Sequence, residues 1–263
     1  SCSVKHKKTF DYIFNKTEAI TLEQSKLTLS KDITVLSFSD SSMVDRNSSI
    51  IKVDSGWIVY SKNSESSILS FTSDGQFSGY IGHRGNGPGE YTSVYDVVVN
   101  QKSKVLEVLS DGGIFCYTFG GDFLDKKEVT YPAFSFAIDD RQNYWFYVGN
   151  NTTYGDAKMI CTDENIANVA YYLHQKSNML PMVENNFGRN GEWLTFHESL
   201  NHDLYTIENG KLDLSYAMDF PNYKLPKKLH ELSGMEVIEE LQRSNYASII
   251  NYLENHDYIF SVS

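Results

Sequence analysis

Gly82-His83-Arg84-Gly85-Asn86-Gly87-Pro88-Gly89-Glu90-Tyr91 is the stretch that decides the fold of this chain. Its glycines, Gly82, Gly85, Gly87 and Gly89, can take positive φ angles without steric cost. Pro88 fixes its own φ and pushes the residue before it towards an extended backbone. Strand-like sequence lies on both sides, so we predict that this stretch is a structural corner between two β units.

Glycine-rich loops also bind phosphates, but three such loops do not fit this sequence. A P-loop ends in Gly-Lys-Ser/Thr and leads into a helix, whereas here Glu90 and Tyr91 follow the last glycine. A dinucleotide fingerprint has the spacing Gly-x-Gly-x-x-Gly before a helix, whereas here the glycines alternate and the β-rich segment 94–99 follows. A kinase-type loop needs a lysine on the next strand and a later catalytic loop, and the sequence contains neither. We therefore predict that the corner has a structural role and does not bind a nucleotide.

The corner and the hairpin before it resemble a known family. Segment 68–77 reads Ile-Leu-Ser-Phe-Thr-Ser-Asp-Gly-Gln-Phe, and the corner contains Gly-x-Gly-Pro-Gly-Glu-Tyr. This pairing resembles the six-bladed β-propeller lipoproteins of gut Bacteroidetes, which are related to NHL-repeat propellers. Segments 20–22 and 33–36 resemble the initial strands of that family, and the resemblance extends over roughly residues 18–120. It implies a fold and little else, because most members have no assigned activity.

Strand-and-turn units of about 40 residues recur along the chain, which is the spacing expected of propeller blades. Asp74-Gly75 separates two strand patterns and is a strong hairpin signal. The predicted strands are, unit by unit, 50–53, 57–60, 68–71 and 77–81; 94–99, 105–109, 114–119 and 123–129; 134–138, 144–148, 158–161 and 169–173; and 193–196, 203–207 and 212–217. Strands at 247–253 and 257–260 begin a further unit. We therefore expect an all-β propeller of about five four-stranded blades, the last incomplete, where the family has six.

Residues 227–244 interrupt the strand pattern. Apolar residues recur there near helical spacing, with charged residues between them, and Pro226 can open a helix as its first residue. We predict a short helical insertion on the side or rim of the propeller. Partner binding through this helix is the alternative.

The N-terminal residues 1–18 are predicted to be a tether, followed by a single β-propeller domain over 19–263, a length common for one large all-β domain. Cys2 lies in Ser1-Cys2-Ser3 before a polar, basic segment. This arrangement resembles the end of a bacterial lipoprotein signal, which implies lipidation of Cys2 and a location in the periplasm or at the outer membrane. The lipid is then the only membrane anchor, since the sequence has no transmembrane run. A free cysteine in a disordered tail is the alternative.

Composition narrows the class of protein. Aromatic residues make up 14% of the chain, mostly 18 Tyr and 15 Phe, and both favour strands. A net charge of −11 argues against a general nucleic-acid-binding protein, which needs a basic face. Cys116 and Cys161 fit as small apolar strand residues, and a disulfide between them stays open.

Three polar residues flank the corner and form one candidate site. His83, Arg84 and Glu90 can make a small ligand-binding site in which Arg84 binds a carboxylate with two hydrogen bonds. The alternative is structural, with Glu90 paired to Arg84 or accepting hydrogen bonds from the many backbone N–H groups of the corner. The structural alternative is favoured.

The segment from His197 to His202 is a near miss to the zinc-binding motif His-Glu-x-x-His. That motif places two histidines four residues apart on one helix face, whereas here they are five apart in a strand-turn-strand context. A metal site at the propeller rim formed by His197, His202 and Asp203 is one interpretation. Solvated polar residues of a turn are the other, and the favoured, interpretation.

We expect a binding protein that recognises a carbohydrate, peptide or protein partner, and the sequence indicates no particular cofactor. The alternative is a propeller enzyme, lactonase-like or lyase-like, with acidic or histidine metal ligands at its central channel. The incomplete last blade is expected to be covered by segments 20–22 and 33–36, or by a neighbouring chain through strand addition.

Overall fold

The computed structural model describes residues 33–37, 44, 48–62, 67–151, 155–174, 185–191, 193–220, 223–232, 234–249, 251–254 and 259–262. The predicted tether, Cys2 and segment 20–22 lie outside the described residues. Contacts divide the chain into two compact units, and the boundary in the sequence falls between Lys127 and Glu128. Each unit has its own sheets and its own core.

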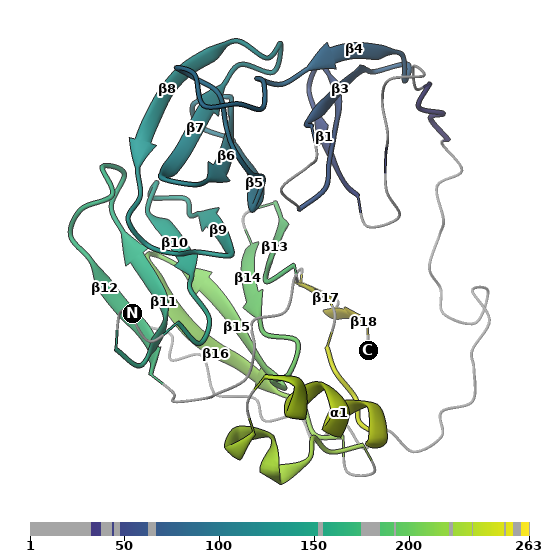
Figure 1. Ribbon diagram of the computed structural model, residues 1–263, viewed down its shortest axis with the longest axis vertical. Coiled ribbons are helices and arrows are strands. Elements are labelled where there is room, and N and C mark those ends of the chain that lie inside the picture. Colours follow the sequence, from purple (N-terminus) through teal and green to yellow (C-terminus); the bar gives the residue numbers. More distant parts are fainter. Residues whose placement is uncertain are drawn as a thin grey trace, which may run out of the picture. The chain divides into compact units, whose positions relative to one another are not determined.

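The first unit contains two four-stranded sheets in which consecutive strands pair antiparallel (Figure 1). The strands are β1 (Ser49–Val53), β2 (Gly56–Tyr60), β3 (Leu69–Thr72) and β4 (Phe77–Tyr80), then β5 (Asp96–Asn100), β6 (Val105–Ser110), β7 (Gly113–Tyr117) and β8 (Phe123–Glu128). Each sheet is a four-stranded meander, the form of a propeller blade. The eight strands predicted for this part of the chain are confirmed to within a few residues.

The core of the first unit joins its two blades. Apolar side chains of β2 and β6 are almost fully buried, and Tyr91 of the corner and Val94 just after it belong to the same cluster. The cluster consists of Val53, Ile58, Tyr60, Ile68, Ile81, Tyr91, Val94, Val97, Leu106, Val108, Phe115 and Tyr117. All five residues of β7 are buried, which explains why this strand reads as a continuous apolar run and not as an alternating one.

The second unit contains two more four-stranded meanders. The strands are β9 (Ser135–Ile138), β10 (Tyr144–Tyr147), β11 (Ala157–Thr162) and β12 (Ala170–His174), then β13 (Phe187–Asn190), β14 (Trp193–His197), β15 (Asp203–Glu208) and β16 (Lys211–Ala217). The first strand of the second sheet, β13, was missed from the sequence because Phe-Gly-Arg-Asn has no β-branched residue and contains a glycine. The other strands of this unit were predicted.

The predicted helical insertion is confirmed. It consists of a 3₁₀ helix, η2 (Lys227–Glu231), and a short α-helix, α1 (Met235–Arg243). Gly234 separates them with a φ of 57°, a conformation that glycine adopts at no steric cost. Val237 is the buried residue of α1, and an ion pair of 2.6 Å between Lys228 and Glu240 connects the two helices.

The expected count of about five blades is wrong. The described residues form four four-stranded blades and one separate two-stranded sheet, β17 (Asn251–Glu254) paired with β18 (Ile259–Val262). β17 is tied to the fourth blade, because the hydroxyl of Thr195 donates to the carbonyl of Tyr252 at 3.1 Å. In the first unit, Ser37 donates its backbone N–H to the carbonyl of Gly75 at 2.8 Å, so the segment 33–37 lies at the β3–β4 turn.

Candidate functional site

The corner between β4 and β5 is closed by its own hydrogen bonds. The carboxylate of Glu90 accepts from the backbone N–H of Gly87 at 2.8 Å. The backbone N–H of Gly85 donates to the carbonyl of Tyr91 at 3.0 Å, and that of Tyr91 donates to the carbonyl of His83 at 3.1 Å. The backbone N–H groups of Gly85, Gly87 and Tyr91, which a glycine-rich loop could offer to a phosphate, are thus occupied within the loop.

Aromatic side chains of the second blade pack on the corner. Gly82 and Gly89 have φ angles of +60° and +76°, and a Cβ at either position would come within 2.5 and 2.6 Å of the rings of Tyr117 and Phe123. The hydroxyl of Tyr117 donates to the carbonyl of Gly89 at 2.8 Å. The corner therefore requires glycine at these two positions both for backbone conformation and for close approach.

The three polar residues of the corner differ in their burial and in their hydrogen bonds. Glu90 is half-buried and bonded within the loop, whereas His83 and Arg84 are exposed. The Nε–H of Arg84 donates to the carbonyl of Thr92 at 3.2 Å, which fixes the base of the guanidinium against the backbone. This arrangement corresponds to the structural alternative for Glu90.

The structure does not bring His197, His202 and Asp203 together as a metal site. His197 is buried at the end of β14. The Nε2 of His202 lies 3.0 Å from the carbonyl of Ala247, and its ring packs edge-on against Phe220. Among the described residues, which include Asp203, no group of three or more His, Cys, Asp or Glu side chains is placed to hold a metal ion.

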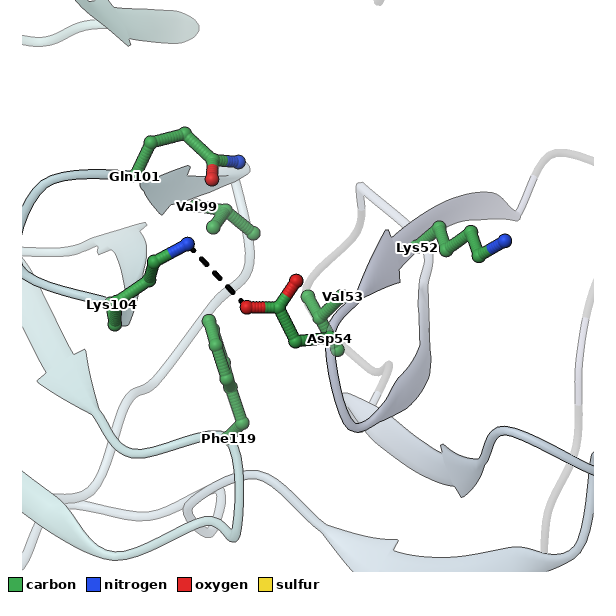
Figure 2. Close-up of a pocket in the computed structure, with 7 residues that line it drawn as sticks. All are labelled: Lys52, Val53, Asp54, Val99, Gln101, Lys104 and Phe119. Atoms are coloured by element: carbon green, nitrogen blue, oxygen red, sulfur yellow. Dashed lines mark hydrogen bonds and ion pairs between the residues drawn. The ribbon is translucent and has the colours of Figure 1, made fainter.

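A pocket of about 340 Å³ lies between the two blades of the first unit (Figure 2). Its walls come from three turns: β1–β2 of the first blade, and β5–β6 and β7–β8 of the second. The lining residues are Lys52, Val53, Asp54, Val99, Gln101, Lys104 and Phe119. None of these residues belongs to a site predicted from the sequence.

The β5–β6 turn is held rigidly by polar contacts to Asn100. The side-chain oxygen of Asn100 accepts from the backbone N–H groups of Lys102 and Ser103, each at 3.2 Å. The backbone carbonyl of Asn100 accepts from the backbone N–H of Lys104 at 2.9 Å. The side-chain amide of Asn100 donates to the buried carboxylate of Glu107 at 2.9 Å. This network places Lys104, with a φ of +56°, at the pocket without using its side chain.

The pocket combines opposite charges with apolar walls. Figure 2 shows the side chains of Lys104 and Asp54 directed toward each other, and their Nζ and Oδ2 atoms are 3.5 Å apart. These side chains are 57% and 87% exposed, so water screens the pair and it contributes at most about 1 kcal/mol. Lys52 directs its ammonium over the ring of Trp57, 5.3 Å from the centroid, and contributes mainly its aliphatic stem.

The equivalent turns of the second unit are arranged differently. There Arg141, in the β9–β10 turn, donates to the side chain of Asn209 in the β15–β16 turn at 3.3 Å. The guanidinium of Arg189 donates to the backbone carbonyl of Ile138, and burial lowers its pKa. Large basic side chains bridge these turns, whereas the corresponding turns of the first unit border the pocket.

A largely buried ion pair links the two blades of each unit. Lys62 pairs with Asp96 at 3.0 Å, and Asp96 also accepts from the hydroxyl of Tyr60 at 3.4 Å. Burial, with the charge of Asp96, raises the pKa of Tyr60. In the second unit, Lys158 pairs with Glu198 at 3.0 Å. Glu198 also accepts from Tyr147 at 2.7 Å and from Asn201 at 3.2 Å, so the segment expected to be a solvated turn contains a buried charge.

Cys116 and Cys161 are buried free thiols. Burial raises the pKa of each to about 12, so both are protonated at neutral pH and neither has the thiolate character of a reactive cysteine. Both lie on strands, as predicted, and the structure does not join them.

Comparison with solved structures identifies the fold. A Bacteroides fragilis protein described as exported matches with a TM-score of 0.74 at 17% identity, covering 87% of this chain and 68% of its own. A DUF4221 family member from Bacteroides vulgatus matches with a TM-score of 0.53 at 11% identity, covering 78% and 67%. A streptogramin B lyase matches with a TM-score of 0.50 at 16% identity, covering 84% and 63%. At these identities the likeness concerns the fold alone.

Sequence comparison supports the same assignment. No curated protein matches the chain. The family model described as "Domain of unknown function (DUF4934)" matches it over residues 6–262. Together with the four-stranded blades and the Bacteroides neighbours, this match confirms the resemblance to a propeller family of Bacteroidetes. The chain belongs to the DUF4934 family.

Proposed function

We propose that this protein is an exported binding protein that holds one residue-sized polar ligand in the pocket of its first unit. The observation that carries the proposal is the combination of Asp54, Lys104 and Phe119 around about 340 Å³ of space. This volume lies at the lower end of the range of small-molecule sites. It suits one unit of a carbohydrate or one residue of a peptide.

The lining residues supply the contacts that such a ligand needs. Asp54 accepts hydrogen bonds, Lys104 donates them, and Gln101 does both. Phe119 and Val99 pack against the apolar core of the unit, so their exposed surfaces form a firm apolar wall. A few polar groups on an apolar support is the usual composition of a ligand site.

The location belongs to the same proposal. The first of the Bacteroides neighbours is described as exported, and none of the described helices is long and apolar enough to span a membrane. We propose a place in the cell envelope, with a lipid on Cys2 as the anchor. Mass spectrometry of the membrane fraction from the native host tests the anchor, and an unmodified Cys2 in a freely soluble pool would remove it. Kinship with six-bladed, NHL-repeat-like propellers is likewise a proposal, supported by the corner between two blades.

Catalysis is the less supported candidate. One neighbour is a streptogramin B lyase, but the likeness is one of fold. Within the described ranges, no group of three or more acidic, histidine or cysteine side chains is placed to bind a metal. The pocket itself offers a ligand-binding surface, so we propose binding.

A screen of glycan and peptide libraries against the purified protein tests this function. A ligand is expected whose affinity falls at least about tenfold, or 1.4 kcal/mol, in Phe119→Ala. Arg84→Ala is the control, because Arg84 belongs to the corner and does not line the pocket. A ligand whose affinity is unchanged in Phe119→Ala but lost in Arg84→Ala would place the site at the corner and overturn the proposal.

A further inference from the structure

We infer that the ligand of this pocket is a small zwitterion that carries an ammonium and a carboxylate on one carbon, as an α-amino acid does. This inference rests on the proposed function and adds the chemical class of the ligand. Its basis is the pair of opposite charges formed by Lys104 and Asp54 beside the apolar surfaces of Val53, Val99 and Phe119 (Figure 2).

The pair is easily separated. Its Nζ–Oδ2 distance of 3.5 Å exceeds the roughly 2.7–2.9 Å of a direct charge-assisted hydrogen bond. Both side chains are more than half exposed, and such surface pairs contribute about 0–1 kcal/mol. A ligand therefore loses little by inserting between the two charges.

A zwitterion replaces both halves of this pair. Its carboxylate takes the place of Asp54 beside Lys104, and its ammonium takes the place of Lys104 beside Asp54. A purely anionic ligand would gain Lys104 but face the charge of Asp54, and a purely cationic ligand would face Lys104. A neutral sugar would separate the pair without restoring either charge interaction.

The separation of the two protein charges also limits the size of the ligand. Standard bond lengths place the ammonium and carboxylate of one α-carbon about 3 Å apart, and each further residue of an extended peptide adds about 3.5 Å. Because Lys104 and Asp54 are only 3.5 Å apart before a ligand enters, a single amino acid requires the smallest opening of the pair, and a peptide with distant ends requires a larger one. Val53, Val99 and Phe119 then provide an apolar wall for the ligand's side chain.

Calorimetric titration with four probes tests this inference: leucine, leucinamide, N-acetylleucine and glucose. Leucinamide lacks the carboxylate and N-acetylleucine lacks the ammonium, so each is expected to bind at least about tenfold more weakly than leucine. Lys104→Gln should weaken leucine about tenfold and remove its advantage over leucinamide. Asp54→Asn should likewise remove its advantage over N-acetylleucine.

The matched control is Lys102→Gln, which removes a lysine from the same turn without touching the pocket lining. It should leave leucine binding unchanged. The side chain of Lys104 takes no part in the hydrogen bonds that hold this turn, so the variants are expected to fold, and circular dichroism checks this.

The outcomes separate the inference from the proposed function. Equal binding of leucine and leucinamide, or of leucine and N-acetylleucine, overturns the zwitterion. Binding of glucose without binding of leucine also overturns the zwitterion. The proposed pocket is then still supported if Phe119→Ala weakens the binding of glucose. If none of the probes binds, the zwitterion is overturned, and the pocket falls as well if no library ligand depends on Phe119.

Discussion

The corner allows a sharp test, because one glycine and one carboxylate compete for the same space. A Cβ at Gly85 would lie 2.0 Å from the Oε2 of Glu90, the atom that accepts from the N–H of Gly87 at 2.8 Å. Replacing Gly85 by alanine must therefore move the carboxylate away from this N–H. We predict that Gly85→Ala destabilises the protein by removing that hydrogen bond and not by straining the backbone, since Gly85 is not among the glycines with positive φ.

The magnitude follows from the contact that is lost. Hydrogen bonds to charged groups contribute about 1.5–3 kcal/mol, and half-burial of Glu90 reduces this to about 1–2 kcal/mol through solvent screening. Glu90→Ala should cost this amount. Gly85→Ala should lower the free energy of unfolding by about 0.4–1 kcal/mol less than Glu90→Ala does. The difference arises because alanine restricts the unfolded chain and thereby stabilises the folded state.

A double-mutant cycle separates this mechanism from general disruption. Once Glu90 is alanine, the contact is already absent, so adding Gly85→Ala should be neutral or slightly stabilising. The coupling free energy from urea unfolding is expected to be about 1–2 kcal/mol, as for residues in direct contact. If Gly85→Ala costs the same in both backgrounds, the carboxylate is not the cause and the reasoning is refuted.

Three further predictions concern burial and strain. Gly89 and Gly155 share φ angles of +76° and +77°, but only Gly89 meets a side chain, so Gly89→Ala should cost at least about 1 kcal/mol more than Gly155→Ala in thermal unfolding; equal costs would contradict a role for the ring. Lys158→Met should cost about 3–5 kcal/mol because it leaves Glu198 charged and buried, and adding Glu198→Gln should recover part of this in urea unfolding; a further loss would count against the ion pair. The Cys161 thiol, with a pKa raised to about 12, stays protonated below that pH. With the other cysteines replaced by alanine, Cys161 should not react with a thiol reagent at mildly alkaline pH until guanidinium unfolds the chain. Prompt labelling of the folded protein would refute this.

Local signals in the sequence were sufficient for most of the fold. Turn chemistry at Asp74-Gly75 and at the corner separates apolar segments of strand length, and antiparallel strands joined by short turns must pair with their neighbours. The helical insertion was also local, because its apolar spacing changes from that of a strand to that of a helix. The strand β13 was missed for the complementary reason: after Phe187 its residues have little strand propensity, and pairing with β14 determines its conformation.

The candidate site depended on contacts that no local signal encodes. Asp54 and Lys104 are 50 positions apart and meet because two blades pack through their shared core. Glu198, which sequence analysis placed in a solvated turn, is buried because Lys158 and Tyr147 reach it from the preceding blade. The sequence by itself determined most of the strands, their turns and the propeller family. Only the tertiary structure decided which turns face each other and which charges become buried, because these depend on how whole blades pack.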